Sequence, residues 1–355
     1  MFTVMLSLSS CGEKYEPVES TPEEERTVMT ISLDSEEYDV PYELYRAFFL
    51  QLKSSIDGGN ADVWTGAEKD KYIEKIDELI VNRIADIYSV FHLCEKADIN
   101  VYSNSFDQRV LEYIEIAVEG GIIGDVIYEG FDGDYNAYLD SLKSMNLNYS
   151  VQDLLLRYQI ALEELSLHYI GNIAEGDASD GAELGVIKYT KEDVEDFYFD
   201  SNASRRVLIA YLDEDYFTAA RAEEIRDTIA SKPDEKSVAN YIASFTLGAP
   251  TSEIVGKYTY DKFYYSEFTN CAFSLEIGQT GPVITLKTDS FDGYIIVYRA
   301  ASTAEYFESD YNTIAHTYLY TCFGQILEET AEGLSASKEY TKYLNELDRS
   351  AISMQ

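Results

Sequence analysis

Hydrophobic residues recur every three or four positions through most of the first half of the chain, a spacing typical of amphipathic helices. The first such face consists of Tyr45, Phe48, Phe49, Leu52 and Ile56. A longer face runs over residues 72–91, behind a capping-box pattern at Thr65 and Glu68. Shorter helices are expected over 106–118 and 135–147, and a second long one over 150–173. Two short strands are expected within residues 27–40, ahead of this helical region.

The period changes after a Gly-, Ala- and Asp-rich stretch at residues 171–185, which is typical of a linker or turn. A helix near residues 191–199 leads out of it. Strands are then expected at 207–211, 254–258, 283–286 and 294–298, with helices at 218–230, 238–245 and 268–275. This mixed order indicates an α+β segment. A capping-box pattern at Ser302 and Glu305 returns the chain to helix, and a last helix is expected over 338–352.

The charge balance excludes several classes of partner. The chain of 355 residues carries 27 basic and 65 acidic side chains, a net charge of −38, and its hydrophobic content of 46% is enough for packed cores. Such a surface repels the phosphates of nucleic acids and the headgroups of anionic lipids. The 31 tyrosines provide large, half-polar contact surfaces, although most single rings are expected to pack helices together.

The first eleven residues form a short apolar run that ends in Leu8-Ser-Ser-Cys11. This resembles the lipobox at the end of a bacterial lipoprotein signal peptide, although no Lys or Arg precedes the cysteine. The resemblance predicts a signal segment over 1–11, a lipid on Cys11 and a flexible tether over 12–26. The remaining cysteines, Cys94, Cys271 and Cys322, have no disulfide or zinc spacing and are expected to be small core residues.

No motif of a known catalytic or metal site is found. His92 and Cys94 are two residues apart, so on a helix they lie on different faces and are poor co-ligands. The run that begins at Asp132 starts like a calcium loop but has Ala137 and Lys143 where that loop needs Gly and Glu, so a helix-start turn is expected. We therefore expect no metal and no cofactor.

One stretch is more specific. It runs from Phe268 through Ala272-Phe273 and Leu275-Glu-Ile-Gly278 to Pro282-Val283, and Gly293-Tyr294 follows it. This is similar to a parvulin domain, and Arg206-Val-Leu-Ile209 resembles the parvulin opening strand. The whole chain resembles the SurA/PrsA group of extracytoplasmic foldases. That resemblance implies a helical SurA-N-like domain over 27–199, an inserted parvulin-like domain over 200–300, and C-terminal helices over 301–355 that pack on the helical domain.

The parvulin pattern is incomplete in its chemistry. Parvulins carry a histidine on the first strand and another on the last, and this chain has Val207 and Ile295 there. The acidic or thiol residue of the family has no clear counterpart in residues 245–250. The resemblance places Tyr264 and Phe268 in the prolyl pocket, and Phe273 joins them as a substrate-binding candidate. No catalytic residue can be assigned.

The sequence thus favours a chaperone that binds unfolded or newly exported polypeptides, with a parvulin domain that is weak or inactive. It would be tethered by its lipid to the outer face of the bacterial cytoplasmic membrane. Two alternatives stay open: an active peptidyl-prolyl isomerase that works without histidines, and a surface lipoprotein that binds a peptide or a cell-wall component. The sequence does not identify the polypeptides that are bound, and it predicts no oligomeric state.

Overall fold

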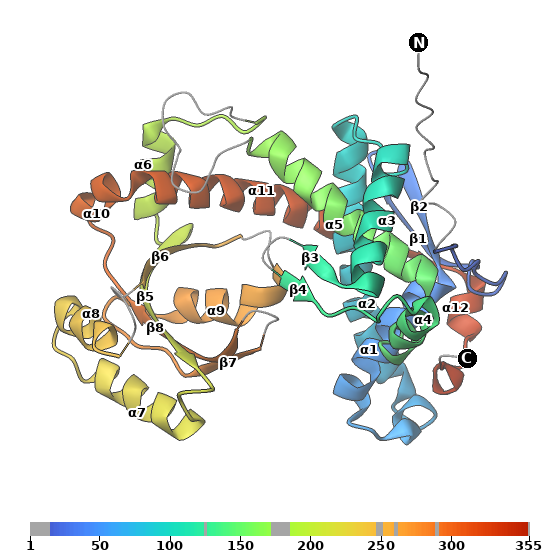
Figure 1. The fold of residues 1–355 in the computed structure, drawn as a ribbon, viewed down its shortest axis with the longest axis horizontal. Coiled ribbons are helices and arrows are strands. Elements are labelled where there is room, and N and C mark those ends of the chain that lie inside the picture. Colours follow the sequence, from blue (N-terminus) through green and yellow to red (C-terminus); the bar gives the residue numbers. More distant parts are fainter. Residues whose placement is uncertain are drawn as a thin grey trace, which may run out of the picture. The chain divides into compact units, whose positions relative to one another are not determined.

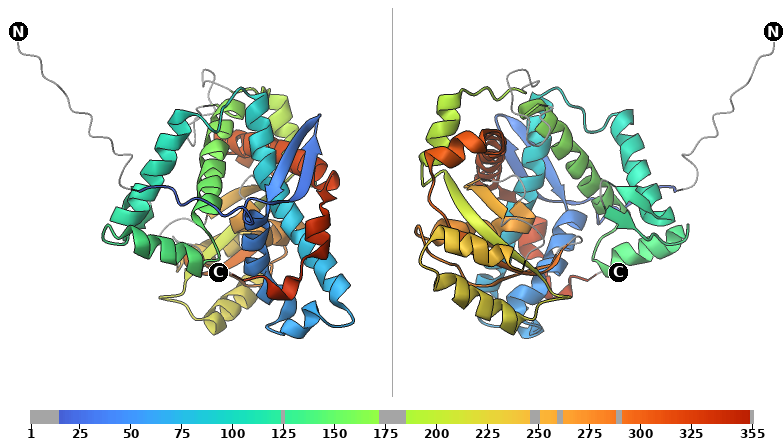
Figure 2. Two further views of the ribbon diagram at one scale, coloured as in Figure 1. Left: turned by 90° about the vertical axis from the view of Figure 1, so that its right-hand side faces the viewer. Right: turned by 60° about the vertical axis from the view of Figure 1, so that its left-hand side comes forward.

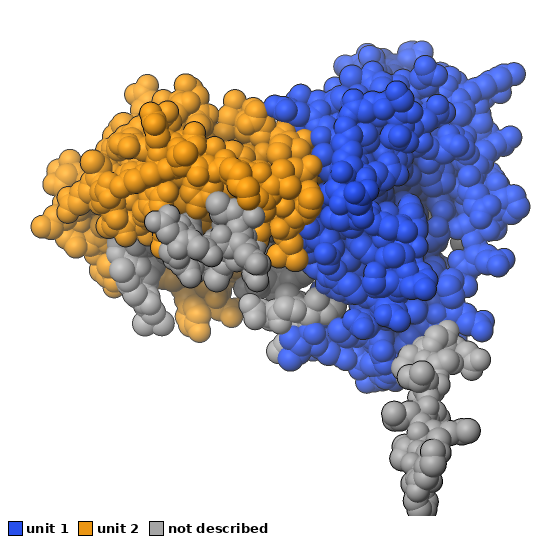
Figure 3. Space-filling view, turned by 90° about the horizontal axis from the view of Figure 1, so that it is seen from above, with its two compact units in different colours: residues 1–165, 329–355 blue, residues 166–328 orange. Residues whose placement is uncertain are grey.

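The computed structural model describes residues 15–123, 126–171, 185–245, 251–258, 262–287 and 291–353. The chain divides into two compact units, coloured separately in Figure 3. The helical unit contains residues 1–165 and 329–355, and the inserted unit contains residues 166–328. The expected lipidation site at Cys11 and most of the expected linker at 171–185 lie outside the described residues.

The helical unit begins with a hairpin and continues as helices (Figure 1). Its elements in chain order are β1 (Thr27–Leu33), β2 (Glu36–Pro41), α1 (Tyr42–Asp57), α2 (Lys69–Lys96), α3 (Asn104–Glu119), β3 (Gly121–Ile123), β4 (Val126–Tyr128), α4 (Tyr135–Ser144), α5 (Tyr149–Tyr169), β9 (Glu339–Tyr340) and α12 (Lys342–Glu346). Short 3-10 helices cover Ala61–Trp64 and Arg349–Ala351. The periodicity thus predicted the main helices, because each buries one apolar stripe.

The inserted unit is built on a four-stranded antiparallel sheet with the order β6-β5-β8-β7. Its elements are α6 (Lys191–Phe199), β5 (Ser204–Asp213), α7 (Ala219–Ala230), α8 (Glu235–Ala243), β6 (Thr251–Gly256), α9 (Lys262–Ser274), β7 (Ile284–Lys287), β8 (Asp292–Arg299), α10 (Ala304–Ser309) and α11 (Tyr311–Ala336). Only the first part of α11 belongs to this unit, and the last residues of α5 also count with it. The fold class is therefore α+β, as the sequence predicted.

Alternation along β5 and β8 gives the sheet two apolar faces (Figure 1). Leu208 and Ala210 point to the face that α7 and α8 cover. Val207 and Ile209 point to the opposite face, where Phe268 and Ala272 of α9 pack on them. A third cluster joins α6, α10 and the start of α11 to Ile254 of β6. The inserted unit is therefore larger than the segment 200–300 expected from the sequence.

The C-terminal segment returns to the helical unit. β9 pairs with β1 and so extends the hairpin to the three-stranded order β2-β1-β9. Figure 2 shows the red C-terminal segment beside the blue hairpin. Behind it, buried Arg349 donates to Asp77 of α2 over 3.1 Å and to the Tyr45 hydroxyl of α1 over 3.2 Å. Tyr45 in turn donates to Asp77 over 2.5 Å. These contacts join residues 272 and 304 positions apart, so the C-terminal residues complete the core of this unit.

Several expected element ends were wrong. Thr65 does not cap a helix, because residues 61–64 form a 3-10 turn and α2 begins at Lys69. The cap of α10 is Thr303, whose hydroxyl accepts from the Tyr306 amide, one residue beyond the expected Ser302. The expected helix over 338–352 is a short strand, one helical turn and a 3-10 turn. Asp134 does cap α4, as expected for the turn after Asp132. Among the described residues no helix has the length and apolar character needed to span a membrane.

Candidate functional site

Two cavities of the helical unit flank Tyr102, a side chain that is 68% exposed. Tyr102 follows α2, where the chain turns toward α3. The larger cavity has about 380 Å³. Its lining is mostly aromatic and aliphatic: Tyr38, Tyr88, Phe91, Glu95, Asp98, Ile99, Asn100, Val101 and Tyr102. The two cavities and the ring between them are called the Tyr102 groove below.

The aromatic wall of the Tyr102 groove is held by polar contacts with α2. The rings of Tyr38 and Tyr88 are 5.4 Å apart, and the Tyr38 hydroxyl donates to Glu95 over 2.9 Å. The same hydroxyl lies 2.9 Å from Nδ1 of buried His92. Burial and Glu95 both raise the pKa of Tyr38, so its hydroxyl stays protonated and keeps donating. These contacts hold Tyr38 against α2, and the wall ends in the carboxylate of Glu95.

The smaller cavity has about 210 Å³ and is lined by Pro41, Glu43, Leu44, Tyr102, Ser150, Val151, Asp153, Leu154 and Arg157. The charge of Arg157 is already neutralised, because its guanidinium lies 2.7 Å from both Asp107 and Asp153. In the larger cavity the charged lining residues, Glu95 and Asp98, are both acidic among those the structure describes. The Tyr102 groove thus combines apolar surface with unneutralised negative charge.

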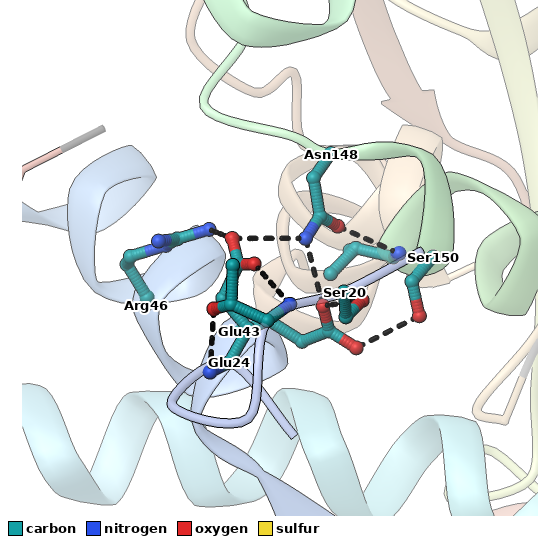
Figure 4. A network of polar contacts seen from close by, with 8 residues as sticks. Ser20, Glu24, Glu43, Arg46, Asn148 and Ser150 are labelled. Atoms are coloured by element: carbon teal, nitrogen blue, oxygen red, sulfur yellow. Dashed lines mark hydrogen bonds and ion pairs between the residues drawn. The ribbon is translucent and has the colours of Figure 1, made fainter. Parts of the chain in front are cut away.

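A polar network fixes the floor of the smaller cavity (Figure 4). Buried Glu43 of α1 accepts from Ser20 over 2.6 Å, from Asn148 over 2.7 Å and from Ser150 over 2.7 Å. Nearby, Arg46 pairs with Glu24 over 2.6 Å. Ser20 and Glu24 lie within residues 12–26, and the network joins them to α1 and to the start of α5. The expectation of a flexible tether over 12–26 was therefore wrong for its described part, because these side chains find buried partners.

The inserted unit has the second candidate site, on the face of the sheet that α9 covers. Val207 and Ile295, which stand where parvulins have histidines, are 0% and 1% exposed in one apolar cluster. They are not opposite each other, because Val207 pairs with Arg299 and Ile295 pairs with Tyr211. Neither position can transfer a proton or donate a hydrogen bond from its side chain.

The predicted pocket aromatics have different surroundings. Phe268 is buried in the α9 cluster, and Phe273 is half-buried at its edge beneath the guanidinium of Arg205, 4.6 Å from the ring centroid. Tyr264 belongs to α9, but its side chain lies outside the described part of the chain. Two of the three proposed substrate-binding rings therefore lie on one face, and their role in substrate binding stays a prediction.

Sequence reasoning missed the polar groups on this face. Glu253 of β6 accepts from the Tyr211 hydroxyl of β5 over 3.0 Å, and burial raises the pKa of this carboxyl. Arg205 and Arg299 lie on the same face near Val207. Alternation along β5 and β6 could have placed these residues beside Val207, but only once the pairing of the strands was known.

The cysteines follow the expectation of small packing residues. Cys94 and Cys271 are buried, Cys322 is half-buried, and all three are free. Burial raises the pKa of the Cys94 thiol to about 12, so it is unreactive at neutral pH. In the described ranges no three His, Cys, Asp or Glu side chains come together in a way that could hold a metal ion.

Comparison with known proteins places this fold beside one group of solved structures. No family model matches the chain, and no curated protein matches it by sequence. The foldase protein PrsA of Streptococcus pneumoniae matches 89% of this chain and 96% of its own, at 12% identity and a TM-score of 0.26. The chain resembles the PrsA foldases.

PrsA of Lactococcus lactis gives a TM-score of 0.24 at 12% identity, with 92% of this chain and 99% of that one covered. The PrsA peptidylprolyl isomerase of Bacillus cereus gives 0.22 at 16% identity, over 80% and 92%. Because the TM-scores are below 0.5 and the identities below 25%, the function has to be argued from this chain's own residues.

Proposed function

We propose that this protein is an extracytoplasmic chaperone of the foldase type, which binds unfolded, newly exported polypeptides in the Tyr102 groove. The observation that carries this proposal is an exposed tyrosine between two cavities with aromatic and aliphatic walls. A large exposed ring costs solvation free energy unless a partner covers it, and tyrosine loses little conformational entropy on binding. An extended client segment could place apolar side chains on both sides of Tyr102.

The charge of the groove supports a preference among clients. Glu95 and Asp98 line the larger cavity, and no cation lines it among the described residues. A segment that carries Lys or Arg next to an apolar side chain would complement both the walls and the carboxylates. The net charge of −38 would keep a protein bound to an aggregation-prone client in solution.

The inserted unit is proposed to have little or no isomerase activity. Prolyl isomerisation has a barrier of about 20 kcal/mol, and lowering it takes groups that stabilise the twisted amide. The two positions where the family has histidines hold buried Val207 and Ile295. One observation favours the alternative of an active isomerase: Glu253 and Tyr211 form a hydrogen-bonded pair on the same face.

The location outside the cytoplasm remains part of the proposal. It rests on the lipobox-like Leu8-Ser-Ser-Cys11 and on the polar stretch behind it. A lipid on Cys11 would attach the protein to the membrane. Mass spectrometry of the protein purified from membranes tests whether Cys11 carries a lipid. The added mass of the lipid should be absent from the Cys11→Ala variant.

The Tyr102→Ala variant tests the client site. Tyr102 is exposed, so truncation should not unfold the unit, while loss of a central aromatic contact typically costs about 1–2 kcal/mol of binding. We expect roughly 5–30-fold weaker binding of an unfolded model protein and less suppression of its aggregation. The matched control is Tyr216→Ala, since Tyr216 is 82% exposed on the inserted unit. Equal loss in both variants, or in neither, would contradict a client site at Tyr102.

A prolyl-isomerase assay on the same proteins distinguishes a chaperone without isomerase activity from an active peptidyl-prolyl isomerase. We expect no acceleration above background for the natural sequence. Turnover that is lost in Glu253→Gln or Tyr211→Phe, with Tyr102→Ala unaffected, would make the inserted unit an enzyme. If the protein neither binds the unfolded client nor accelerates prolyl isomerisation, the remaining alternative, a surface lipoprotein that binds a peptide or a cell-wall component, is favoured.

A further inference from the structure

Two arginines of the inserted unit extend from the same face of the sheet. Val207 of β5 pairs with Arg299 of β8, and Arg205 lies two residues before Val207 on β5. Because side chains two residues apart share a face of a strand, both guanidinium groups lie on the α9 side. Arg205 covers the ring of Phe273 at 4.6 Å from its centroid.

Neither arginine has an acidic partner within the described ranges of the chain. Arg299 is 4% exposed, and its buried Nη1 has no hydrogen-bond acceptor there. The buried Nε of Arg205 also lacks an acceptor, and its Nη1 donates only to the carbonyl of neighbouring Ser204, over 3.2 Å. By contrast, buried Arg46, Arg206 and Arg349 pair with Glu24, Glu235 and Asp77.

Placing the guanidinium groups of Arg205 and Arg299 on the same face costs folding free energy. Burial and the charge of Arg205 together lower the pKa of Arg299 to about 10. Exposed Asp200 at the end of α6 acts on Arg205 without an ion pair, and Glu253 is engaged by Tyr211. A buried guanidinium that lacks an acceptor at Nη1 and lies near a like charge destabilises a fold, and a bound anion removes that cost. The two arginines thus make this face of the sheet positively charged in a chain with 65 acidic residues.

We propose that Arg205 and Arg299 form an anion site that takes a carboxylate carried by a polypeptide, either a chain terminus or an acidic side chain. Guanidinium donors match the two oxygens of a carboxylate. The half-buried ring of Phe273 packs on the cluster of buried Val207 and Val255, and its remaining surface is apolar and lies beside Arg205. This suits an anion attached to an apolar chain better than a free hydrated ion. This site is independent of the Tyr102 groove and does not require isomerase activity.

Calorimetric titration of the full chain tests the site. The probes are N-acetyl-Ala-Ala-Phe with a free carboxylate, its amide, and an amide of the same length that carries one Glu side chain. We expect the free acid or the Glu peptide to bind at least tenfold more tightly than the plain amide, and their order to tell which source the site prefers. Arg205→Met and Arg299→Met should each weaken that binding at least tenfold. Arg221→Met, an exposed control on α7, should leave it unchanged.

The melting temperature of Arg299→Met is a second readout. It distinguishes an arginine that is kept for binding from one that stabilises the fold. Arg299→Met removes a buried charge without a partner, so its Tm should rise by about 2–4 °C in the absence of peptide. A lower Tm would mean that Arg299 supports the fold. Equal affinity for all three peptides, or binding of inorganic phosphate with no binding of carboxylates, would also overturn the assignment.

Discussion

At the scale of single residues, several charged or polar side chains are buried in the helical unit, Glu43 and Arg349 among them. Cys94 and Cys271 were predicted to be core residues because apolar neighbours surround them in sequence, and both are buried. Glu43 and Arg349 are also buried, but nothing in their local sequence indicates it. Their burial depends on partners such as Asn148 and Asp77, more than 100 positions away. Periodicity cannot predict contacts of that range.

Arg349→Met should destabilise the helical unit strongly. The substitution leaves Asp77 buried without its cation, which typically costs about 3–5 kcal/mol in the free energy of unfolding. Denaturant unfolding followed by circular dichroism measures the loss. In the double variant Asp77→Leu with Arg349→Met, no charge is left unpaired, so much of the stability should return.

The same loss should depend on pH. Burial raises the pKa of Asp77, while Arg349 and Tyr45 lower it again. Without Arg349 the pKa rises further, so the folded variant holds a proton that the unfolded chain releases. The stability from that proton is present at low pH and is lost as the pH rises through the folded pKa. The deficit of Arg349→Met should thus be smaller near pH 5 than near pH 7, and a constant deficit would contradict an ionised, unpaired Asp77.

At the scale of elements, helices and long strands follow from the pattern, while their ends do not. α1 and α2 bury the stripes that the sequence shows. The cap residues shifted because Thr65 precedes a 3-10 turn and because Thr303, not Ser302, takes the cap of α10. β3, β4 and β9 were missed, since strands of two or three residues carry no measurable alternation.

Glu43→Ala should loosen the junction of the N-terminal segment, α1 and α5. Three donors lose their acceptor at once, those of Ser20, Asn148 and Ser150. Leaving buried donors unpaired costs about 1–3 kcal/mol each at most, and part of it can be recovered from water. Hydrogen exchange should become faster over residues 20–26 and 148–152. The control is Glu37→Ala on the exposed side of β2, and equal exchange in both variants would show that Glu43 does not hold the junction.

At the scale of the whole molecule, the contacts divide the chain into residues 1–165 with 329–355 and residues 166–328. The parvulin-like domain over 200–300 stays a prediction. α6 and α10 lie outside residues 200–300 but pack on Ile254 of β6, a contact that local periodicity cannot predict. Ser204 donates to the carbonyl of Phe197, and the Thr303 amide donates to the Tyr198 hydroxyl. Segments on both sides of 200–300 are thus tied to the sheet.

Two fragments test this difference. Residues 186–328 retain the cluster of α6, α10 and the start of α11, whereas residues 200–300 lose Val194, Phe197 and Phe307 from it. Removing one large buried side chain typically costs about 3–5 kcal/mol, so the short fragment should unfold at room temperature or at a much lower Tm. Near-UV circular dichroism on heating measures both. Equal melting would mean that the sheet with α7, α8 and α9 is self-sufficient.

The most direct test of the account locates a bound client. A photo-crosslinking amino acid is placed at position 102, or at position 216 as a control that is at least as exposed and lies on the inserted unit. The protein is then mixed with an unfolded client. Covalent adducts at 102 and none above background at 216, reduced when the client lacks Lys and Arg, are the predicted result. Adducts at 216 with none at 102 would contradict a client site in the Tyr102 groove.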